Sequence, residues 1–474
     1  MSYWSLLLLI AEWLIRLAMM PILVRRRGTT AAMAWLLVIF FEPFIGLFLY
    51  LLIGENRLPR RRIRKHASAT SSVDLTNQLG QTQPHITRPQ LPPEQASLVT
   101  LAERLGDLPI VGGNEVLMMP DTAQVIERVI ADIDAAEHHV HILMYIFEAD
   151  ETGRRIADAL IRARQRGVAC RVLADAVGSR PLFKGLHQPL LDAGVEVIAA
   201  LPVNVFRRGL ARLDLRNHRK LVVIDGSIAY SGSQNIVDPT YGRRDLVWHD
   251  MMLRLTGPVV LHLQGVFIED WYFETGKMLE SADILPEPRV TGEAIVQVLP
   301  SGPTYPTENY QRLVVAALHA AEREVIITSP YLVPDEPLLQ AMQTAVLRGV
   351  RVDMIVPYRS DQPLASTAGR AYYAQLLEIN VNLHLHHEGL LHAKTVTIDD
   401  AVALVGSSNF DIRSFKLNFE LNLLLYGPEA AAELRHHQKQ YMQQSTRLTL
   451  KQWQARPAWR RLIQDSARLL SPLL

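Results

Sequence analysis

The sequence of 474 residues contains a single cysteine, Cys170. One thiol excludes a disulfide framework and a zinc site built from cysteines. Cys170 lies in the apolar stretch VACRVLAD, where a buried and unreactive thiol is expected. An excess of charge is also lacking, because 49 lysines and arginines face 48 aspartates and glutamates, for a formal net charge of +1. The composition therefore predicts no general attraction to nucleic acid.

Long apolar runs occur near the N-terminus, at 4–24 and 31–53. Each is about as long as the roughly 20 residues that a bilayer-spanning helix needs. Glu12 and Arg16 interrupt the first run at a spacing that lets them pair on one helical face, and Pro43 is expected to kink the second. Positive charge follows the first run, which argues against a cleaved signal peptide. We expect residues 1–56 to form a membrane segment of two transmembrane or re-entrant helices.

Basic residues on either side of the second run predict its orientation. Three arginines lie between the runs (25–27), and six basic residues follow the second run, at positions 57, 60, 61, 62, 64 and 65. The positive-inside rule then places the rest of the chain on the cytoplasmic side. Residues 57–105 are first basic and then rich in Pro, Gln, Ser and Thr, which predicts a linker.

A motif that occurs twice dominates the remaining sequence. The stretches NHRKLVVIDGSIAYSGSQN (217–235) and LHAKTVTIDDAVALVGSSN (391–409) align without a gap. In each, a histidine and a lysine two residues apart leave the same face of a predicted strand. A turn at the aspartate and a return strand would bring the Gly-Ser-x-Asn loop back beside the histidine.

The repeat extends upstream of both motifs. Strands are predicted at 140–147 and 325–329 and amphipathic helices at 153–166 and 336–347, in the same order before each motif. Two copies of one α/β unit therefore fill most of the chain. One copy alone would fit a buried hairpin whose polar groups satisfy one another, but the pair favours a functional site.

Twin H-x-K-x-x-x-x-D motifs with Gly-Ser-x-Asn tails resemble the phospholipase D superfamily. The stretches RLDLRNHRK, SPYLVPDEPLL, GLLHAKT and DIRSFKLNFE, with the apolar N-terminus, resemble the bacterial cardiolipin synthases. The resemblance implies an α/β fold of two phospholipase D-like sandwich repeats, each a mixed sheet covered by helices, that form one pseudo-twofold catalytic body. The first domain would span 106–283, and the second 284–474 with a C-terminal amphipathic helix.

The same resemblance implies a phosphatidyltransferase of the bacterial inner (plasma) membrane. It would join two phosphatidylglycerol molecules into cardiolipin and glycerol through a phosphohistidine, with no metal or other cofactor and no nucleic-acid partner; homo-oligomerisation stays open. Alternatives are a hydrolytic phospholipase D and a transferase with another donor or acceptor, such as phosphatidylethanolamine. A nuclease is disfavoured by the near-neutral charge. A non-enzymatic lipid-binding scaffold is disfavoured because both motifs are intact.

The chemistry of a phosphodiester suggests a role for each group, because it needs a nucleophile, a cationic cradle and an acid for the leaving alkoxide. The two copies are nearly symmetric, so the sequence alone does not say which histidine attacks. The resemblance favours His218 as nucleophile and His392 as general acid/base. Asp225 and Asp399 complete the motifs, where ion pairs or turn hydrogen bonds are the expected role. The expected residues are catalytic (His218, Lys220, Asp225, His392, Lys394, Asp399), phosphate-binding (Asn235, Asn409, Ser233, Ser407) and histidine-orienting (Asp250, Glu420).

Three further features have open interpretations. The segment from asparagine to orienting carboxylate is four residues longer in the first copy. The cluster HLHHEGLLH leaves a metal site as an alternative, through His384, His386, His387 and His392. Two basic and apolar stretches, at 201–220 and 457–474, are expected to contact lipid or to pack on the body. In the second, Trp459, Leu462, Ile463, Leu469 and Leu470 share one helical stripe, beside Arg460, Arg461 and Arg468.

Overall fold

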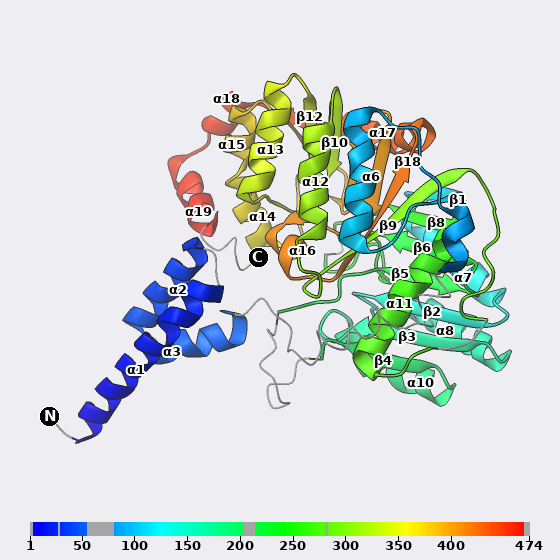
Figure 1. The fold of residues 1–474 in the computed structure, drawn as a ribbon, viewed down its shortest axis with the longest axis horizontal. Helices are drawn as coiled ribbons and strands as arrows, with labels where there is room; N and C mark the ends of the chain where they lie inside the picture. Colours follow the sequence, from blue (N-terminus) through cyan, green and yellow to red (C-terminus); the bar gives the residue numbers. More distant parts are fainter. Residues whose placement is uncertain are drawn as a thin grey trace. The chain divides into compact units, whose positions relative to one another are not determined.

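The computed structural model describes residues 3–26, 29–54, 80–202, 214–243, 245–279 and 283–468. The chain divides into a small unit, which contains the N-terminal helices, and a large α/β unit. Figure 1 shows the helices and strands of both units in sequence colours. Each unit is described by itself.

The N-terminal unit contains one long apolar helix and three shorter helical segments. They are α1 (Tyr3–Arg26), α2 (Thr29–Phe41), α3 (Pro43–Leu49) and a π-helical turn (Tyr50–Gly54). Within the described residues, α1 alone is long and apolar enough to cross a membrane. The 13 residues of α2 reach about 20 Å at 1.5 Å per residue, short of a hydrocarbon core of about 30 Å. The second expected span is therefore interrupted: Glu42 leaves the helical conformation and Pro43 starts a new helix.

The charged pair inside α1 forms as predicted. Arg16 Nη2 lies 3.2 Å from Glu12 Oε2, and Arg16 Nε donates to the carbonyl of Phe40 in α2 at 3.1 Å. A small apolar cluster joins the helices of this unit, formed by Met19, Leu23, Ile39 and Tyr50. The two polar side chains thus satisfy each other and a free carbonyl near the end of α2, which lowers the cost of placing them in an apolar helix.

The α/β unit is built on one mixed sheet. Its strand order is β19-β13-β12-β10-β15-β16-β18-β9-β1-β8-β6-β5-β2-β3-β4. The first repeat supplies β1 (Val111–Met119), β2 (His139–Met144), β3 (Ala169–Asp175), β4 (Glu196–Ala200), β5 (Leu221–Ile224), β6 (Ile228–Gly232) and β8 (Met252–Thr256). The second supplies β9 (Ala294–Ser301), β10 (Glu324–Thr328), β12 (Arg351–Pro357), β13 (Asn382–His386), β15 (Thr395–Ile398), β16 (Val402–Gly406), β18 (Glu420–Tyr426) and β19 (Ser445–Leu448). The antiparallel pair β1 and β9 joins the repeats.

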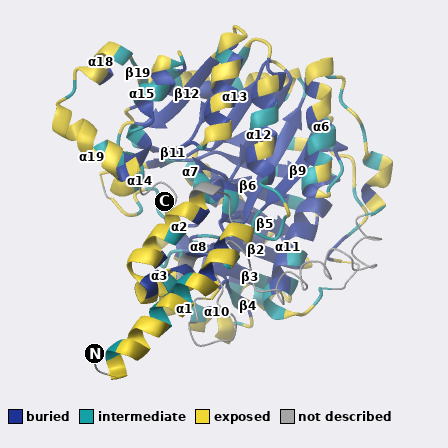
Figure 2. Cartoon of the chain, turned by 60° about the vertical axis from the view of Figure 1, so that its left-hand side comes forward, coloured by how far each residue is buried: buried dark blue, intermediate teal, exposed yellow. Residues whose placement is uncertain are grey.

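Helices cover the sheet, as the predicted layers require. The first repeat has α7 (Thr122–Asp134), α8 (Glu151–Gln165), α9 (Arg180–Gly185), α10 (His187–Asp192) and α11 (Val259–Thr275). The second has α12 (Asn309–Ala320), α13 (Glu336–Leu347), α14 (Pro363–Arg370), α15 (Tyr373–Glu378), α16 (Ile412–Lys416), α17 (Pro428–Gln443), α18 (Leu450–Gln454) and α19 (Ala458–Arg468). Figure 2 shows buried strands beneath helices with exposed outer faces. The predicted strands and helices before each motif are confirmed as β2, β10, α8 and α13.

One apolar cluster spans both repeats. It includes Leu253 and Leu255 of β8, Val298 of β9, and Ile326 and Ile355 of the second repeat, all buried. The two repeats therefore share a core, and their strands cannot separate without exposing it to water.

The predicted linker is wrong over its C-terminal part. Residues 55–79 lie outside the described residues, but Gly80–His85 form a 3₁₀ helix and Pro93–Gly106 form the helix α6. Leu98, Val99 and Ala102 of α6 are buried in the core of the second repeat. The stretch ASLVTLAERL has the apolar spacing of an amphipathic helix, which the surrounding Pro and Gln residues obscured. A segment that precedes the first repeat thus packs on the second (Figure 1).

The motif aspartates fix the turns of the hairpins. Asp225 accepts hydrogen bonds from the backbone N–H groups of residues 137–139 at 2.8–2.9 Å. Asp399 does the same for residues 322–324 and also accepts from Gln95 Nε2 at 2.6 Å. Both lie five residues beyond the motif lysine, across a four-residue strand, about 16 Å along the chain. Their inclusion among the catalytic residues is corrected, and the structural role holds.

We expect Asp399→Ala to lower the free energy of unfolding by on the order of 3 kcal/mol, because it leaves several hydrogen-bond donors unpaired. The matched control is the neighbouring Asp400→Ala, which loses an exposed ion pair with Arg323 and a half-buried one with Arg435 and should cost about 1 kcal/mol. Denaturant unfolding followed by circular dichroism measures both. Equal losses for the two variants would contradict the structural role of Asp399.

Candidate active site

Both motif histidines line one cavity of about 460 Å³. The cavity draws on both repeats: Tyr145, Arg216, His218, Asn235, Tyr241 and Trp248 come from the first, and Tyr331, Asp361, His392, Asn409, Asp411, Arg413 and Asn418 from the second. The prediction that the two motifs meet is therefore confirmed by geometry. The histidines stand at the start of equivalent hairpins, β5–β6 and β15–β16.

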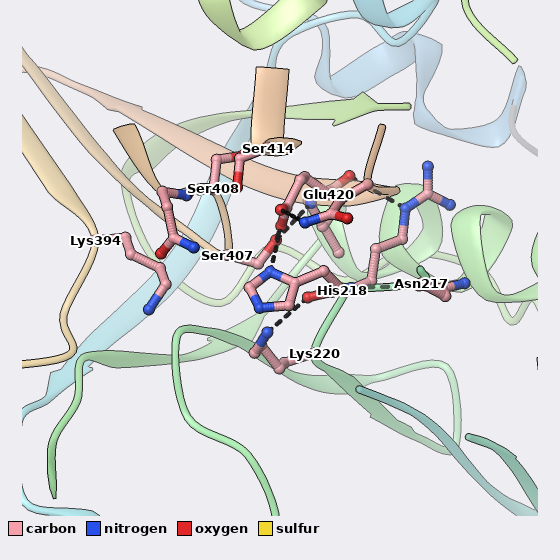
Figure 3. A network of polar contacts seen from close by, with 12 residues as sticks. Asn217, His218, Lys220, Lys394, Ser407, Ser408, Ser414 and Glu420 are labelled. Atoms are coloured by element: carbon pink, nitrogen blue, oxygen red, sulfur yellow. Dashed lines mark hydrogen bonds and ion pairs between the residues drawn. The ribbon is translucent and has the colours of Figure 1, made fainter. Parts of the chain in front are cut away.

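Each histidine is held by a carboxylate from the other repeat. His218 Nδ1 lies 2.9 Å from Glu420 Oε2, and His392 Nδ1 lies 2.6 Å from Asp250 Oδ1. Figure 3 shows Glu420 reaching His218 from the strand β18. A carboxylate on Nδ1 fixes the orientation and tautomer of the ring. The sequence predicted both carboxylates, and the structure shows that the pairs cross between repeats.

The backbone repeats this exchange. The N–H of His218 donates to the carbonyl of Phe419, the residue before Glu420, at 2.8 Å. The N–H of His392 donates to the carbonyl of His249, the residue before Asp250, at 2.7 Å. Short parallel pairing of β14 (Leu390–Leu391) with β7 (Trp248–His249) extends the second contact. The main chain therefore sets the distance between each histidine and its carboxylate.

The predicted phosphate-binding serines contact the carboxylates instead. Ser233 Oγ donates to Asp250 Oδ1 at 2.7 Å, and Ser407 Oγ donates to Glu420 Oε2 at 2.5 Å. Each hydroxyl also accepts the N–H of the residue after its carboxylate, Met251 or Leu421. The prediction that the serines bind phosphate is corrected, because both hydroxyls are already engaged in holding the carboxylates.

The lysines and asparagines lie around the histidines. Lys220 Nζ donates to the carbonyl of His218 at 2.7 Å, and Lys394 Nζ to that of His392 at 2.6 Å. Asn235 accepts the N–H of Ile146, which leaves its amide donors. Asn409 lies beside Asp411, and its Oδ1 has no partner among the described residues. Both amides line the cavity, as the predicted phosphate contacts require.

Burial dominates the electrostatics of the site. It lowers the pKa of His218 to about 4, against the opposing effect of Glu420, and it lowers the pKa of His392 against Asp250. The pKa of Lys220 falls to about 7 and that of Lys394 to about 8, again through burial. Burial alone would raise the pKa of Asp250, but His392 and Lys394 outweigh it and hold the value at about 2.

Two aromatic residues that the sequence did not indicate cover the histidines. The ring of Tyr145 lies 4.6 Å from that of His218, and the ring of Trp248 lies 4.4 Å from that of His392. Trp248 belongs to the segment that is four residues longer in the first repeat, and its Nε1 donates to the carbonyl of Tyr241 at 3.1 Å. In the sequence, the greater length of this segment indicated that the two half-sites differ.

The histidine-rich stretch does not assemble a metal site in the described part of the chain. His384 contacts Asp353 at 2.8 Å, His386 the carbonyl of Tyr441 at 3.2 Å, and His387 the hydroxyl of Thr446 at 2.8 Å. These partners lie on different elements, and no group of three or more His, Cys, Asp or Glu side chains converges among the described residues. The metal alternative therefore lacks a ligand set there.

Two α/β repeats that each bring a histidine and an asparagine to one cavity, with a buried lysine on the carbonyl of each histidine, define the phospholipase D superfamily. The family model described as "Cardiolipin synthase, PLD-like domain" matches residues 129–271 and 314–442, and the model described as "Phospholipase_D-nuclease N-terminal" matches residues 13–55. The chain is 38% identical to cardiolipin synthase A of Yersinia pseudotuberculosis and of Yersinia pestis, over 100% of this chain and 97% of each relative. The chain therefore belongs to the cardiolipin synthase family.

Solved structures support the fold. Phosphatidylserine synthase of Haemophilus influenzae superposes with a TM-score of 0.63 at 16% identity, over 80% of this chain and 100% of that chain. Polyphosphate kinase of Porphyromonas gingivalis gives a TM-score of 0.50 at 14% identity, over 81% of this chain and 57% of that chain. At these identities the likeness concerns the fold alone.

We expect Ser407→Ala to lower kcat about tenfold or more, the usual cost of losing a group that orients an active-site ligand, with little change in KM. The neighbouring Ser408→Ala is the control, because its hydroxyl accepts from Asn422 rather than contacting Glu420. Steady-state kinetics at several lipid concentrations separate the two constants. A rise in KM without loss of kcat would restore the serine to the substrate-binding set.

Proposed function

We propose that the protein is a cardiolipin synthase that joins two phosphatidylglycerol molecules and releases glycerol. The observation that carries the proposal is the pair of histidines on one cavity, each held at Nδ1 by a carboxylate. This arrangement leaves both Nε2 atoms for a phosphodiester, one to attack and one to transfer a proton. Membership in the cardiolipin synthase family supports phosphatidyl transfer as the reaction and phospholipids as the substrates.

In the first half-reaction, His218 Nε2 attacks the phosphorus of the donor lipid. A P–N bond forms as the P–O bond to glycerol breaks, and the proton on His392 Nε2 passes to the departing glycerol oxygen. A pKa of about 4 keeps His218 neutral at physiological pH, as a nucleophile must be. The anionic donor adds to the effect of Asp250 and favours the protonated form of His392.

In the second half-reaction, His392 acts as the base. It takes the proton from the terminal glycerol hydroxyl of a second phosphatidylglycerol, whose oxygen attacks the phosphohistidine. The P–N bond breaks, cardiolipin leaves, and His392 is protonated again for the next cycle. Lys220, Lys394 and the amides of Asn235 and Asn409 would bind the phosphoryl oxygens, the lysines as charges and the amides as donors.

Water and other alcohols are the competing acceptors. A hydrolytic phospholipase D would use the same two histidines, and phosphatidylethanolamine would serve as donor if the cavity accepts its headgroup. The aromatic cover of Tyr145 and Trp248 over the histidines favours a lipid alcohol, because it limits the access of water to the phosphohistidine. The proposed site of action is the cytoplasmic face of the inner membrane, on the basis of the arginines that follow the second apolar run.

Product analysis tests this proposal. With phosphatidylglycerol in vesicles, the purified protein should yield cardiolipin and glycerol; phosphatidic acid alone would make it a hydrolase. A phosphatidyl ester of p-nitrophenol assigns the histidines, because that leaving group needs no proton. His392→Ala should give a burst of nitrophenol and a trapped adduct, and His218→Ala should give neither. An adduct in His218→Ala would reverse the assignment.

The pH dependence of kcat/KM should show two limbs. On the acid side, it should fall as His218 becomes protonated near pH 4. On the alkaline side, it should fall first as His392, whose pKa is lowered by burial, loses the proton that it must donate, and further as Lys220 and Lys394 lose their charge, near pH 7 and 8. The alkaline limb of kcat should lie higher than that of kcat/KM, because bound phosphate raises both lysine pKa values. A kcat/KM that stays constant up to pH 10 would contradict the role of the lysines.

A further inference from the structure

The helix α19 presents an apolar stripe to solvent. Trp459, Leu462 and Ile463 follow the i, i+3, i+4 spacing of one helical face, and they are 59%, 69% and 53% exposed. In contrast, Ala467 is buried, and Gln464 is half-buried, so another face of the helix packs on the body. The predicted stripe is thus partly confirmed; Leu469 and Leu470 lie outside the described residues. A large apolar surface with a basic border is typical of a binding surface.

Arginines are concentrated on α19 and next to it. Arg460, Arg461 and Arg468 belong to α19, Arg456 precedes it, and Arg370 ends the helix α14. Burial, together with the charges of Arg370, Arg460 and Arg461, lowers the pKa of the Arg456 guanidinium to about 10. Asp465 is the one acidic residue on α19. The surface is therefore strongly cationic, and an anionic partner would relieve the repulsion.

Contacts tie this surface to the wall of the active site. The helix α19 packs on α14, and Gln362 and Ala365, at the start of α14, line the catalytic cavity. The guanidinium of Arg468 lies 4.5 Å from the ring of Tyr372. Arg456 Nη1 donates to Gln464 Oε1 at 2.6 Å, which links α19 to the segment before it. Figure 1 shows α19 beside α14.

We propose that α19 docks on a bilayer of anionic phospholipid. Trp459, Leu462 and Ile463 enter the interface, the arginines bind the lipid phosphates, and α14 carries the docked position to the wall of the cavity. Charge complementarity selects this partner, because the same helix offers an exposed apolar stripe and three arginines against one aspartate. The benefit for catalysis rests on the proposed phosphatidyl transfer, whereas the docking itself does not.

A single label on α19 tests the docking in the full chain. Cys170 is buried and its thiol pKa is raised to about 11, so an introduced cysteine takes the label selectively. Ile463→Cys carries an environment-sensitive fluorophore, and Leu347→Cys on α13, at an exposed leucine, is the control. Both are made with His218→Ala, so that the lipid is not consumed, and are placed in nanodiscs of phosphatidylglycerol or of phosphatidylcholine alone.

At position 463, we expect a blue shift and several-fold weaker quenching by iodide in phosphatidylglycerol discs, and full quenching in phosphatidylcholine discs. At the control position 347, we expect full quenching in both lipids. Strong iodide quenching of position 463 in both lipids would overturn the docking. Weak quenching in both lipids would overturn the role of the arginines in selecting an anionic bilayer. This measurement needs no turnover. It therefore tests the docking even if the protein does not catalyse the proposed reaction.

Charge reversal measures the effect on catalysis. Arg460→Glu/Arg461→Glu should raise the KM for phosphatidylglycerol in mixed vesicles by about fivefold or more for each arginine, with kcat within twofold. The matched control, Arg154→Glu/Lys184→Glu, reverses two exposed charges on α8 and α9 and should leave the KM unchanged. A KM within twofold of the wild-type value, or an equal rise in the control, would overturn the role of α19 in bringing the enzyme to its lipid substrate.

Discussion

The exchange of carboxylates between the repeats is the constraint on which the site depends. Neither half-site is complete within its own repeat, because His218 needs Glu420 and His392 needs Asp250. The main-chain bonds to the preceding residues, Phe419 and His249, fix the same crossing. The β1–β9 pairing and the shared apolar cluster hold the repeats in the register that both pairs require.

The site also pairs its buried lysines with buried carboxylates before substrate arrives. Lys220 and Lys394 are buried with the carboxylates of Asp250 and Glu420, so each lysine has anionic groups near it. A buried charge is costly unless it is paired, and here each carboxylate is further held by a serine hydroxyl and a ring nitrogen. An incoming phosphodiester changes this balance by one negative charge, which favours a protonated imidazole beside it.

The sequence predicted the parts of the site better than their connections. The hairpins, the strands before them and the helices α8 and α13 follow from apolar periodicity, and the gapless repeat identified the histidines, lysines, asparagines and carboxylates. The crossing was not predictable, because Asp250 and Glu420 occupy equivalent positions and spacing does not say which histidine each one meets. The serines were misassigned because a hydroxyl beside a phosphate-binding loop has the same sequence signature whether it faces the ligand or a carboxylate. The helix α6 was missed because its apolar face is short and its neighbours are polar, although its partner is the core of the second repeat.

The crossing has a consequence for the symmetry of the site. Two identical copies of one repeat, related by a twofold axis, would exchange carboxylates in the same way, and both histidines would then be forced to work in identical surroundings. Covalent fusion of the copies removes that symmetry requirement, and each half is free to specialise. The half-sites differ in three ways: the first repeat has Trp248 and four additional residues in the same segment, and it supplies Asp250 where the second supplies Glu420. In a single chain with two unlike halves, the half-site that receives the donor and the half-site that activates the acceptor can therefore differ.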